Sequence, residues 1–465
     1  MRLAQSPAGA QGTDQADRTP NGHVPGAGPA RLLAELRAVP APASSQEAVS
    51  FAEHRRRYPA PPGPRRNGDA PQIDLIDLIG RSGLSGRGGA AFPTGRKLDA
   101  VVHGRGPAVV IVNGAEGEPA SGKDRLLLRR LPHLVIDGAL LAAAAVGAER
   151  VVICIDRTST AALASVRRAV AERAAAAAGA EPAVAIDVAA TPPRYVAGES
   201  SALVQWLNNG PAKPTAAPPA PRQRGVAGRP TLVQNVETLA HLAQIARFGS
   251  EWFRQTGTPG EPGTTLLTVS GAVARPAVIE TAIGTPIEHI LASAGGLLGE
   301  PPALLIGGFF GTWVPTAAAR HAPFSRAGLA PLGAQPGSGV VIALPEGACG
   351  LAETARIMAW FAAESAGQCG PCRYGLADLA AGAASLARPH DGPAAPSGQV
   401  ARLRRWADQI DGRGACHHPD GAVNLLRSAM RVFADDLAHH EQGWPCRGAS
   451  APPALHVPAV HSAWR

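Results

Sequence analysis

Lysine and aromatic side chains are scarce in this sequence of 465 residues. Phe, Trp and Tyr together make up 4% of the chain, and Lys97, Lys123 and Lys213 are its only lysines, so the net charge of +8 rests on arginine. A coding bias toward Arg and small residues accounts for this pattern, since the chain also carries 54 Gly and 44 Pro. No basic run is interleaved with aromatic residues, and we therefore expect no nucleic-acid binding.

Long apolar runs are also missing. The strongest one, Gly138–Val152, is interrupted by charge before it reaches the roughly 20 residues that a membrane-spanning helix needs. The first 30 residues contain no apolar segment of the kind found in secretory signals. Six cysteines are too few for a disulfide-based fold of this length, and their clustering indicates metal binding instead. We expect a cytoplasmic protein that does not itself span a membrane.

The first half of the chain predicts one layered domain behind a leader. Residues 1–70 are rich in Pro, Gly, Ala and Arg and are predicted to be mostly disordered. β-branched runs at Ala108–Gly114 and Glu149–Asp156 predict buried strands, with apolar stretches of helical spacing between and after them. This alternation over residues 71–250 predicts an α/β domain with a largely parallel sheet. Within it, Thr231–Gly249 is predicted to be helical throughout.

The second half divides into two further units and a tail. Residues 262–338 combine strand-like runs, one helical pattern and glycine turns, which predicts a small α+β module. Over residues 345–445 every pattern is helical and amphipathic, and the helices surround clustered cysteines, which predicts a helical bundle. Residues 446–465 form the predicted tail.

A glycine-rich turn, "SGRGGAAFPTGRK" at Ser85–Lys97, is the first motif that points to a ligand. Glycines let the backbone approach a phosphate closely and direct N–H groups at it, while Arg87 and Lys97 supply positive charge. A helical pattern rather than a strand precedes the turn, so the context of a dinucleotide-binding Rossmann motif is not met. A plain surface turn is the alternative, but one of only three lysines lies here and favours anion binding.

Polar residues also follow the first predicted strand. Ligands of open α/β sheets bind at the carboxyl ends of the strands, where we expect Asn113, Glu116 and Glu118. These side chains can hydrogen-bond a ribityl chain, a ribose or a ring nitrogen. Alternatively, they form the acidic start of a helix, with Lys123 and Asp124 as a structural pair.

Two shorter motifs carry further candidate side chains. Tyr195, one of only three tyrosines, precedes a Gly198–Glu199 turn that opens a helix. Gln234 and Asn235 are placed at a helix start, where their amides can bind a flavin or cap the helix. Each motif is weak evidence when taken alone.

The cysteines give the most specific pattern. Cys369 and Cys372 stand three apart in "ESAGQCGPCRYG", and Cys416 follows much later in the chain. A further cysteine is expected at position 366, where the chain carries alanine. Three thiols suit an iron–sulfur cluster, a zinc site with three cysteines and one histidine, or an empty loop that can form a disulfide. The candidates for a fourth ligand are Cys349, His417 and His418.

Together the motifs resemble those of one family. From Ile73 to His440, the order of the glycine-rich loop, the acidic turn, "YVAGES", "QNVET" and the cysteine loop is similar to the F-type, or 51-kDa, flavoprotein subunit of NADH-quinone oxidoreductase (respiratory complex I). That family is shared with the diaphorase subunits of NAD-reducing hydrogenase and formate dehydrogenase. The resemblance implies an α/β flavin-binding domain, a ubiquitin-like SLBB module and a C-terminal helical bundle. It also implies FMN, NADH as substrate, and a 4Fe–4S or 3Fe–4S cluster.

The resemblance assigns residues to each ligand. Those implied for FMN are Gly86, Arg87, Gly88, Lys97, Asn113, Glu116, Tyr195, Gly198, Glu199, Gln234 and Asn235. Those implied for NADH are Phe92 and Glu118. Those implied for the cluster are Cys369, Cys372 and Cys416. No side chain is implied as catalytic, because the flavin carries the chemistry.

Several family positions are changed in this chain. The changes are Leu98, Ala100, Ala115, Ser200, Ala366 and the segment Ala217–Ala220. On the NADH side they remove two aromatic rings and a cation, which predicts NADH binding weaker by about 2–4 kcal/mol. Most of the residues implied for FMN are retained.

The sequence therefore predicts a flavoprotein electron-transfer subunit that oxidises NADH or NADPH. The implied partner is a ferredoxin-like or other electron-transfer subunit, or a membrane reductase complex. Such partners would hold the protein at the inner face of the plasma membrane. The alternative is a docking or scaffold module, with or without FMN, that does not oxidise NADH itself.

Overall fold

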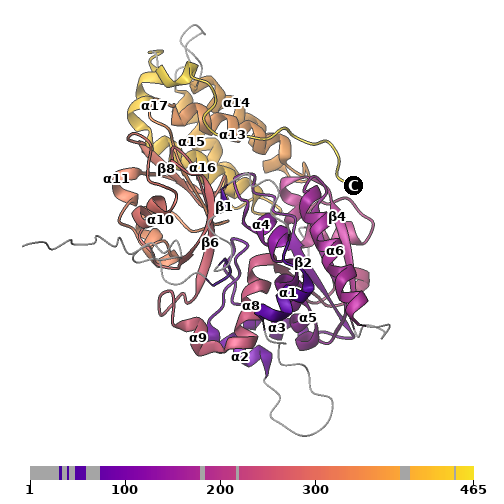
Figure 1. The fold of residues 1–465 in the computed structure, drawn as a ribbon. Helices are drawn as coiled ribbons and strands as arrows, with labels where there is room; N and C mark the ends of the chain where they lie inside the picture. Colours follow the sequence, from indigo (N-terminus) through magenta and orange to yellow (C-terminus); the bar gives the residue numbers. More distant parts are fainter. Residues whose placement is uncertain are drawn as a thin grey trace, which may run out of the picture.

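Two β-sheets and a helical bundle follow one another along the chain (Figure 1). The computed structural model describes residues 31–33, 39–40, 48–58, 74–177, 184–215, 219–387, 398–444 and 447–465. Most of the predicted leader lies outside these residues, as does the first half of the changed segment Ala217–Ala220. The leader's regular elements within them are the strand β1 (Val39–Pro40) and the helix α1 (Phe51–Arg57).

The first sheet has four parallel strands in the order β4-β3-β2-β5. Its strands are β2 (Ala108–Gly114), β3 (Ala148–Asp156), β4 (Ala185–Thr191) and β5 (Thr231–Asn235). The two predicted strands are confirmed as β2 and β3. The chain builds from β2 to β4 and then returns to the other side of β2. The carboxyl ends of β2 and β5 therefore form a switch point, where open α/β sheets bind ligands.

The prediction of one helix over Thr231–Gly249 is wrong at its start. Thr231–Asn235 forms β5, and the helix α8 spans Val236–Phe248. Pairing with β2 buries Leu232, and this tertiary pairing outweighs the helical pattern that continues downstream. Asn235 divides the two elements, because its side chain accepts hydrogen bonds from the first turn of α8.

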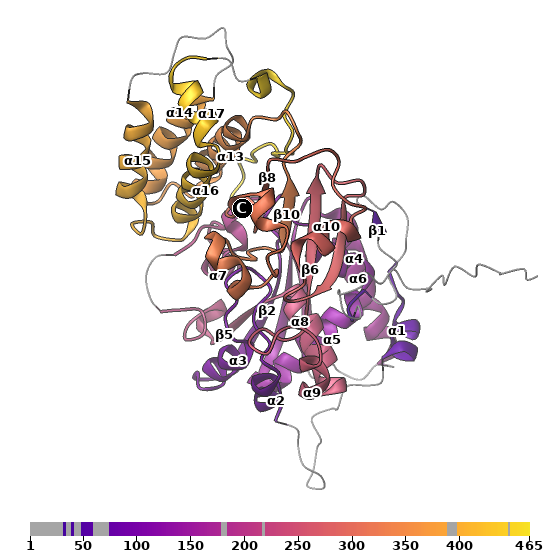
Figure 2. The same cartoon turned by 90° about the vertical axis from the view of Figure 1, so that its left-hand side faces the viewer.

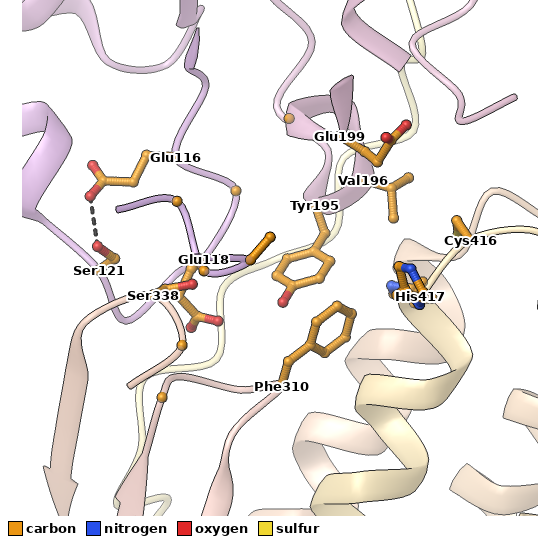
Figure 3. Close-up of a pocket in the computed structure, with 18 of the residues that line it drawn as sticks. Glu116, Glu118, Ser121, Tyr195, Val196, Glu199, Phe310, Ser338, Cys416 and His417 are labelled. Atoms are coloured by element: carbon orange, nitrogen blue, oxygen red, sulfur yellow. Dashed lines mark hydrogen bonds between the residues drawn. The ribbon is translucent and has the colours of Figure 1, made fainter. Parts of the chain in front are cut away.

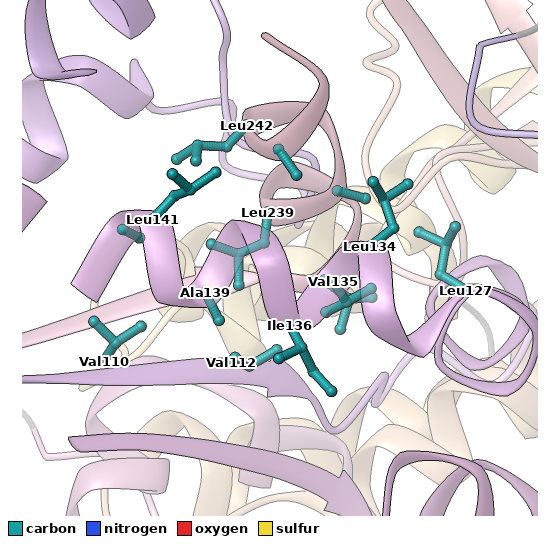
Figure 4. Close-up of a cluster of buried hydrophobic side chains, with 14 of the residues drawn as sticks. Val110, Val112, Leu127, Leu134, Val135, Ile136, Ala139, Leu141, Leu239 and Leu242 are labelled. Carbon is teal, nitrogen blue, oxygen red and sulfur yellow. The ribbon is translucent and has the colours of Figure 1, made fainter. Parts of the chain in front are cut away.

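Helix α5 (Pro132–Val146) packs between the first sheet and α8 (Figure 4). A Cβ at Gly138 would lie 2.0 Å from the carbonyl oxygen of Leu239, so glycine permits the close approach of α5 and α8. This buried layer supports the strands whose ends carry the polar motifs. The other helices of this part are α2 (Leu75–Ser82), α3 (Thr94–Val102), α4 (Lys123–Arg130), α6 (Thr160–Ala176), α7 (Ser200–Leu207) and α9 (Ser250–Arg254).

The second sheet has six strands in the order β1-β7-β6-β10-β8-β9. Its strands after β1 are β6 (Thr264–Gly271), β7 (Ala277–Ala282), β8 (Ala303–Ile306), β9 (Thr312–Pro315) and β10 (Val340–Ala343). Its helices are α10 (Ile287–Ser293), α11 (Thr316–Ala319) and α12 (Arg326–Leu329). β6 and β10 are parallel neighbours, so a strand beyond residue 338 belongs to this sheet.

The C-terminal region is a helical bundle, which Figure 2 shows above the six-stranded sheet. Its helices are α13 (Gly350–Glu364), α14 (Leu376–Leu386), α15 (Gln399–Ile410), α16 (His418–Val432) and α17 (Ala434–Glu441). The cysteine loop connects α13 to a turn at Pro371–Gly375 that leads into α14. The predicted order of α/β domain, small α+β module and helical bundle is confirmed.

The end of the chain returns from the bundle to the α/β domain (Figure 1). There the N–H of Ala212 donates to the carbonyl of Trp464 (2.8 Å), and Arg157 donates to the carbonyl of Arg465 (2.7 Å). The tail therefore connects the first and last parts of the fold. Among the described residues, no helix combines the length and apolar character that a membrane crossing requires.

Candidate functional site

A cavity of about 770 Å³ lies where three parts of the chain meet. One wall is the edge of the first sheet, where Asn113 and Asn235 stand opposite each other in the pairing of β2 with β5. The loops after β8 and before β10 form a second wall, and Cys416–His418 at the start of α16 form a third (Figure 3). Its volume is in the range of small-molecule and cofactor sites.

Most residues implied for FMN line this cavity. The predicted residues in its lining are Arg87, Gly88, Asn113, Glu116, Glu118, Tyr195, Gly198, Glu199, Asn235 and Cys416. The predicted residues outside its lining are Gly86, Phe92, Lys97, Gln234, Cys369 and Cys372. Phe92 is 52% exposed, whereas the buried Gln234 amide donates to the Thr94 hydroxyl (3.3 Å).

The glycine-rich loop presents backbone to the cavity. Gly89 has a φ of +103°, which favours glycine, and a Cβ at Gly88 would lie 3.3 Å from the Cβ of Asn235. Gly86 closes the turn by donating its N–H to the Phe92 carbonyl (2.9 Å). A loop of this kind suits a phosphate, which requires close approach of backbone N–H groups.

Arg87 uses its guanidinium to tie this loop to neighbouring segments. Nη1 donates to the Ser85 hydroxyl (2.8 Å), and Nη2 donates to the carbonyls of Pro262 (3.3 Å) and Thr264 (3.2 Å). Its Nε also lies 3.9 Å from a carboxylate oxygen of Glu237. The guanidinium is therefore already bonded, although the residue lines the cavity.

Lys97 is a cation without a counter-charge. It lies partly buried in α3, and no hydrogen bond or ion pair joins its amine to another described residue. Burial lowers the pKa of Lys97 to about 8. A partly buried amine without a partner is costly, and a phosphate would supply that partner. Lys97 lies outside the lining of the cavity, so its role at the phosphate of FMN stays a prediction.

Lys123 is fully paired by contrast. Its Nζ lies 2.9 Å from Asp124 Oδ1 and 2.9 Å from Glu237 Oε2, which confirms the predicted Lys123–Asp124 pair. The second oxygen of Asp124 accepts a hydrogen bond from the Asn235 amide (2.6 Å). These bonds fix the position of Asn235 at the cavity wall.

The carboxylate of Glu116 caps a helix, as the alternative interpretation of the acidic turn proposed. It accepts hydrogen bonds from the N–H groups of Asp124 (3.0 Å) and Arg125 (2.9 Å) at the start of α4, and from the Ser121 hydroxyl (2.7 Å; Figure 3). Glu199 caps α7 in the same way, through the N–H of Ser201 (2.8 Å). Glu116 and Glu199 therefore hold the starts of α4 and α7 in place at the cavity wall.

Buried Glu118 and partly buried Tyr195 face each other in the cavity (Figure 3). The Glu118 carboxylate accepts the N–H groups of Phe309 (2.9 Å) and Ala120 (3.2 Å), and the Tyr195 hydroxyl points toward it (Figure 3). Burial raises the pKa of Glu118 to about 7, and these hydrogen bonds only partly oppose it. Phe310 packs against the Tyr195 ring with a centroid separation of 4.7 Å. An ionisable carboxyl that changes charge near neutral pH thus faces the cavity.

The three cysteines of the predicted cluster influence one another. Burial, the neighbouring Cys369 thiol and the charge of Cys416 raise the pKa of Cys372 to about 12. All three thiols are free, so the disulfide of the empty-loop alternative is not formed.

The arrangement favours a cluster over a single ion. The described part of the chain holds no group of three or more His, Cys, Asp or Glu side chains placed to bind one metal ion, so the zinc alternative is not supported. An iron–sulfur cluster differs, because its thiolates bind separate iron atoms. Three neighbouring thiols therefore fit such a cluster.

The proposed fourth ligands are engaged elsewhere. Cys349 precedes α13 and lies beside His440 (Sγ to Nε2, 3.9 Å), at the opposite end of that helix from the cysteine loop. His418 is buried and its Nε2 bonds the Phe361 carbonyl (2.9 Å), while exposed His417 pairs with Asp420. Of the three candidates, His418 is both buried and within two residues of Cys416.

Sequence reasoning missed the contribution of the second sheet. The cavity residues that it did not anticipate include Gly307, Phe310, Gly311, Gly337, Ser338 and Asn424. The signal was present as "GGFFG" directly after β8, a glycine pattern resembling that of the first loop. Gly307 and Gly337 have φ values of +101° and +53°, so these loops also approach the cavity through glycine backbone.

Comparison with known proteins follows the same division of the chain. Residues 79–244 match the Nuo51 FMN-binding domain, residues 266–304 match the SLBB domain, and residues 352–440 match the NADH-ubiquinone oxidoreductase-F iron-sulfur binding region. The NAD+-reducing NiFe-hydrogenase in its H2-reduced state is a similar solved structure, with a TM-score of 0.72 and 30% sequence identity. That likeness covers 80% of this chain, which spans 62% of the hydrogenase chain.

Curated relatives extend over most of the sequence. The F-type subunit of NADH-quinone oxidoreductase from Streptomyces coelicolor is 31% identical over 381 residues, which cover 80% of this chain and 84% of the relative. The second F-type subunit of the same enzyme in Rhizobium meliloti is 31% identical over 380 residues, covering 79% and 89%. This chain therefore belongs to the family of F-type subunits of NADH-quinone oxidoreductase.

Proposed function

We propose that this chain is a flavoprotein subunit that oxidises NADH or NADPH and passes electrons through an iron–sulfur centre to a partner protein. One observation carries the proposal: a single cavity joins the glycine-rich loop and the strand ends at one side to Cys416 at the other. FMN, when bound there, accepts a hydride and releases single electrons. The flavin site and the iron–sulfur site share this cavity, which suits the transfer of electrons from one to the other.

The chain's own residues bind and orient. Lys97 compensates the charge of the phosphate, and the glycine-rich loop supplies backbone N–H groups to it. Asn113 donates to the Gly198 carbonyl (2.8 Å), which holds the end of β2 against the turn before α7. The Tyr195 and Phe310 rings exclude water from one side of the cavity. Glu118 holds or releases a proton at its carboxyl near neutral pH.

The acceptor of the electrons is proposed to be a ferredoxin-like or other electron-transfer subunit. The similar proteins carry names of multisubunit assemblies, an NADH-quinone oxidoreductase and an NAD+-reducing hydrogenase. By the same reasoning, we place this chain in the cytoplasm, held at the inner face of the plasma membrane if its partner is a membrane reductase complex.

A second candidate function follows from the residues implied for NADH, the electron donor. Phe92, implied for NADH, is 52% exposed and outside the cavity lining, and Ser200 and Ala220 replace further family residues. These features favour a docking module that binds FMN but receives electrons from its partner. The two functions differ in one step, the reduction of the flavin by a nicotinamide.

Anaerobic absorbance spectroscopy separates the two functions. The full chain is purified without oxygen, its FMN is quantified, and NADH is then added in increments, with NADPH in a parallel sample. We expect flavin bands that bleach with one nicotinamide per flavin. Bound flavin that bleaches with dithionite but with neither nicotinamide would replace the oxidoreductase by the docking module. Absence of flavin after incubation with FMN would contradict both functions.

A further inference from the structure

The cysteine loop has a lysine contact where a fourth thiolate is missing. Ala366 is only 5% exposed, and the Nζ of Lys213 donates to its carbonyl oxygen (2.9 Å). Lys213 is one of only three lysines in the chain, and it comes from the loop after α7 rather than from the bundle. A positive charge from the α/β domain is therefore held beside the residue that replaces the ligand.

The C-terminal tail holds this lysine in place. The Trp464 ring centroid lies 4.8 Å from Lys213 Nζ and 4.1 Å from the guanidinium carbon of Arg194, so the ring contacts two cations. The backbone of Trp464 is itself fixed, because its carbonyl accepts the N–H of Ala212 (2.8 Å). Such cation–π contacts are favourable when they are shielded from water.

Arg194, which also contacts the Trp464 ring, anchors the beginning of the cysteine loop. Arg194 donates to the Ala363 carbonyl (2.8 Å), and its Nε lies 3.3 Å from the Glu364 carboxylate. Glu364 also accepts the N–H of Tyr195 (2.9 Å). The loop thus has a defined path from Ala363 to Ala366 without a metal bond at Ala366.

Charge and ligand supply both disfavour a fourth iron. A fourth iron needs an anionic or neutral donor, yet Glu364 is paired with Arg194, and Cys349 lies at the far end of α13. The Lys213 ammonium, held at the Ala366 carbonyl, repels an iron cation. The same ammonium stabilises the negative charge of a cluster that has three thiolates and no fourth iron.

We propose that Cys369, Cys372 and Cys416 hold a three-iron 3Fe–4S cluster, and that Lys213, fixed under Trp464, supplies the positive charge at the corner that Ala366 leaves without a ligand. The proposal rests on the proposed function, because it takes the iron–sulfur site as given. It adds the type of cluster and a positioning residue, Lys213, that acts on it from the α/β domain.

The test compares the full chain with its A366C variant. Both are purified anaerobically and assayed for iron, sulfide and electron paramagnetic resonance. For the natural chain we expect about three irons per chain and a signal in the oxidised state that disappears on one-electron reduction. For A366C we expect about four irons and a signal that appears only after reduction. Four irons in the natural chain, or no iron in it after reconstitution, would overturn the proposal.

Variants of Lys213 test its role. Lys213→Met removes the positive charge, so the reduction potential of the cluster should move to a more negative value and iron should be lost about tenfold faster to a chelator. Lys213→Arg should retain the natural potential. Arg157→Gln is the matched control, because it removes a bond to the tail at Arg465 without touching Lys213. An unchanged potential in Lys213→Met would overturn the role of the lysine.

Flavin bleaching by NADH is measured on the same samples. Hydride transfer to the flavin does not require the cluster, so this readout tests the proposed function alone. A three-iron cluster in a protein whose flavin is not bleached would support the cluster assignment and contradict the oxidoreductase. Bleaching of the flavin by NADH in a protein that holds a four-iron cluster would support the oxidoreductase and contradict the cluster assignment.

Discussion

The flavin side and the cluster side of the cavity are built in different ways. On the flavin side, Asn113 and Asn235 end neighbouring strands of a parallel sheet, and buried layers on α5 and α8 support those strands. On the cluster side, Cys369 and Cys416 lie on loops, Cys372 lies in the turn Pro371–Gly375, and a lysine distant in sequence contacts the Ala366 carbonyl. The first site is fixed by the core, whereas the second is fixed by segments that arrive from elsewhere in the chain.

This difference teaches where a site tolerates the loss of a ligand. A residue at a strand end keeps its place because the pairing of the whole sheet determines it. A loop that loses a metal ligand must find another restraint, and here Lys213, Arg194 and Trp464 provide one. The loss of a thiolate at Ala366 is therefore compatible with a defined loop, while most of the implied FMN residues remain.

The largest expected effect tests whether the flavin site and the cluster site are independent of each other. Cys372→Ala should abolish bound iron and leave bound FMN unchanged, because Cys372 is outside the lining of the cavity. Iron and flavin are quantified on one anaerobic sample. Cys154→Ala is the control, since that thiol is buried in β3 and away from the cysteine loop. Loss of FMN together with iron in Cys372→Ala would show that the sites depend on each other.

The flavin side alone should respond to Lys97. Lys97→Met removes the unpaired cation, so the dissociation constant of FMN should rise about 10- to 100-fold, as expected for loss of a hydrogen bond to a charged group. FMN affinity is measured by fluorescence quenching of the free flavin. The neighbouring Arg96 is exposed, and Arg96→Met serves as the control. Equal FMN affinity in Lys97→Met and the natural chain would remove Lys97 from the phosphate site.

Much of the flavin side could be predicted from the sequence. The strand β2 was predicted because a continuous β-branched run ends in polar residues, and such a run has few other uses in an α/β protein. β5 was missed because the helix that follows extends the same apolar pattern. The role of Glu116 as a helix cap was left open, since a carboxylate after a strand suits both a cap and a ligand.

The restraint on the cluster side could not be predicted. Lys213 and Trp464 lie far apart in the sequence, and no local periodicity links a lysine in a proline-rich loop to a tryptophan in a tail. The wall formed by Phe310 is a similar case, because it requires the second sheet to pack over the first. Contacts of this kind depend on tertiary packing, which the pattern of one segment does not contain.

Glu118 sharpens the comparison through pH, because it is buried within the flavin side. Its pKa is raised from 4.5 to about 7 by burial, so the folded protein binds a proton more tightly than the unfolded chain. The resulting stability is fully present below about pH 4.5 and is lost as the pH rises through about 7. Glu118→Gln should remove this loss, leaving the variant about 2 kcal/mol more stable than the natural chain at pH 8.5, relative to their difference at pH 5.

Chemical denaturation of the flavin-free protein at the two pH values measures this effect. Glu300→Gln provides the control, because that carboxyl is exposed. A Glu118→Gln stability curve parallel to that of the natural chain between pH 5 and 8.5 would show that Glu118 keeps an ordinary affinity for its proton.

The smallest effect on stability is expected at the tail. There we predict a local change in the cysteine loop rather than a large loss of global stability. Trp464→Ala removes the contacts to Arg194 and Lys213, so the free energy of unfolding should fall by only about 1 kcal/mol. The cysteine loop should nevertheless exchange its amide hydrogens faster, because Lys213 loses the ring that holds it. Trp444→Ala is the matched control, since that ring is 62% exposed and packs only on His439 among the aromatic and cation contacts of the described residues. Faster exchange in both variants, or in neither, would mean that the tail does not restrain the loop, and the cluster side would then owe its shape to the bundle alone.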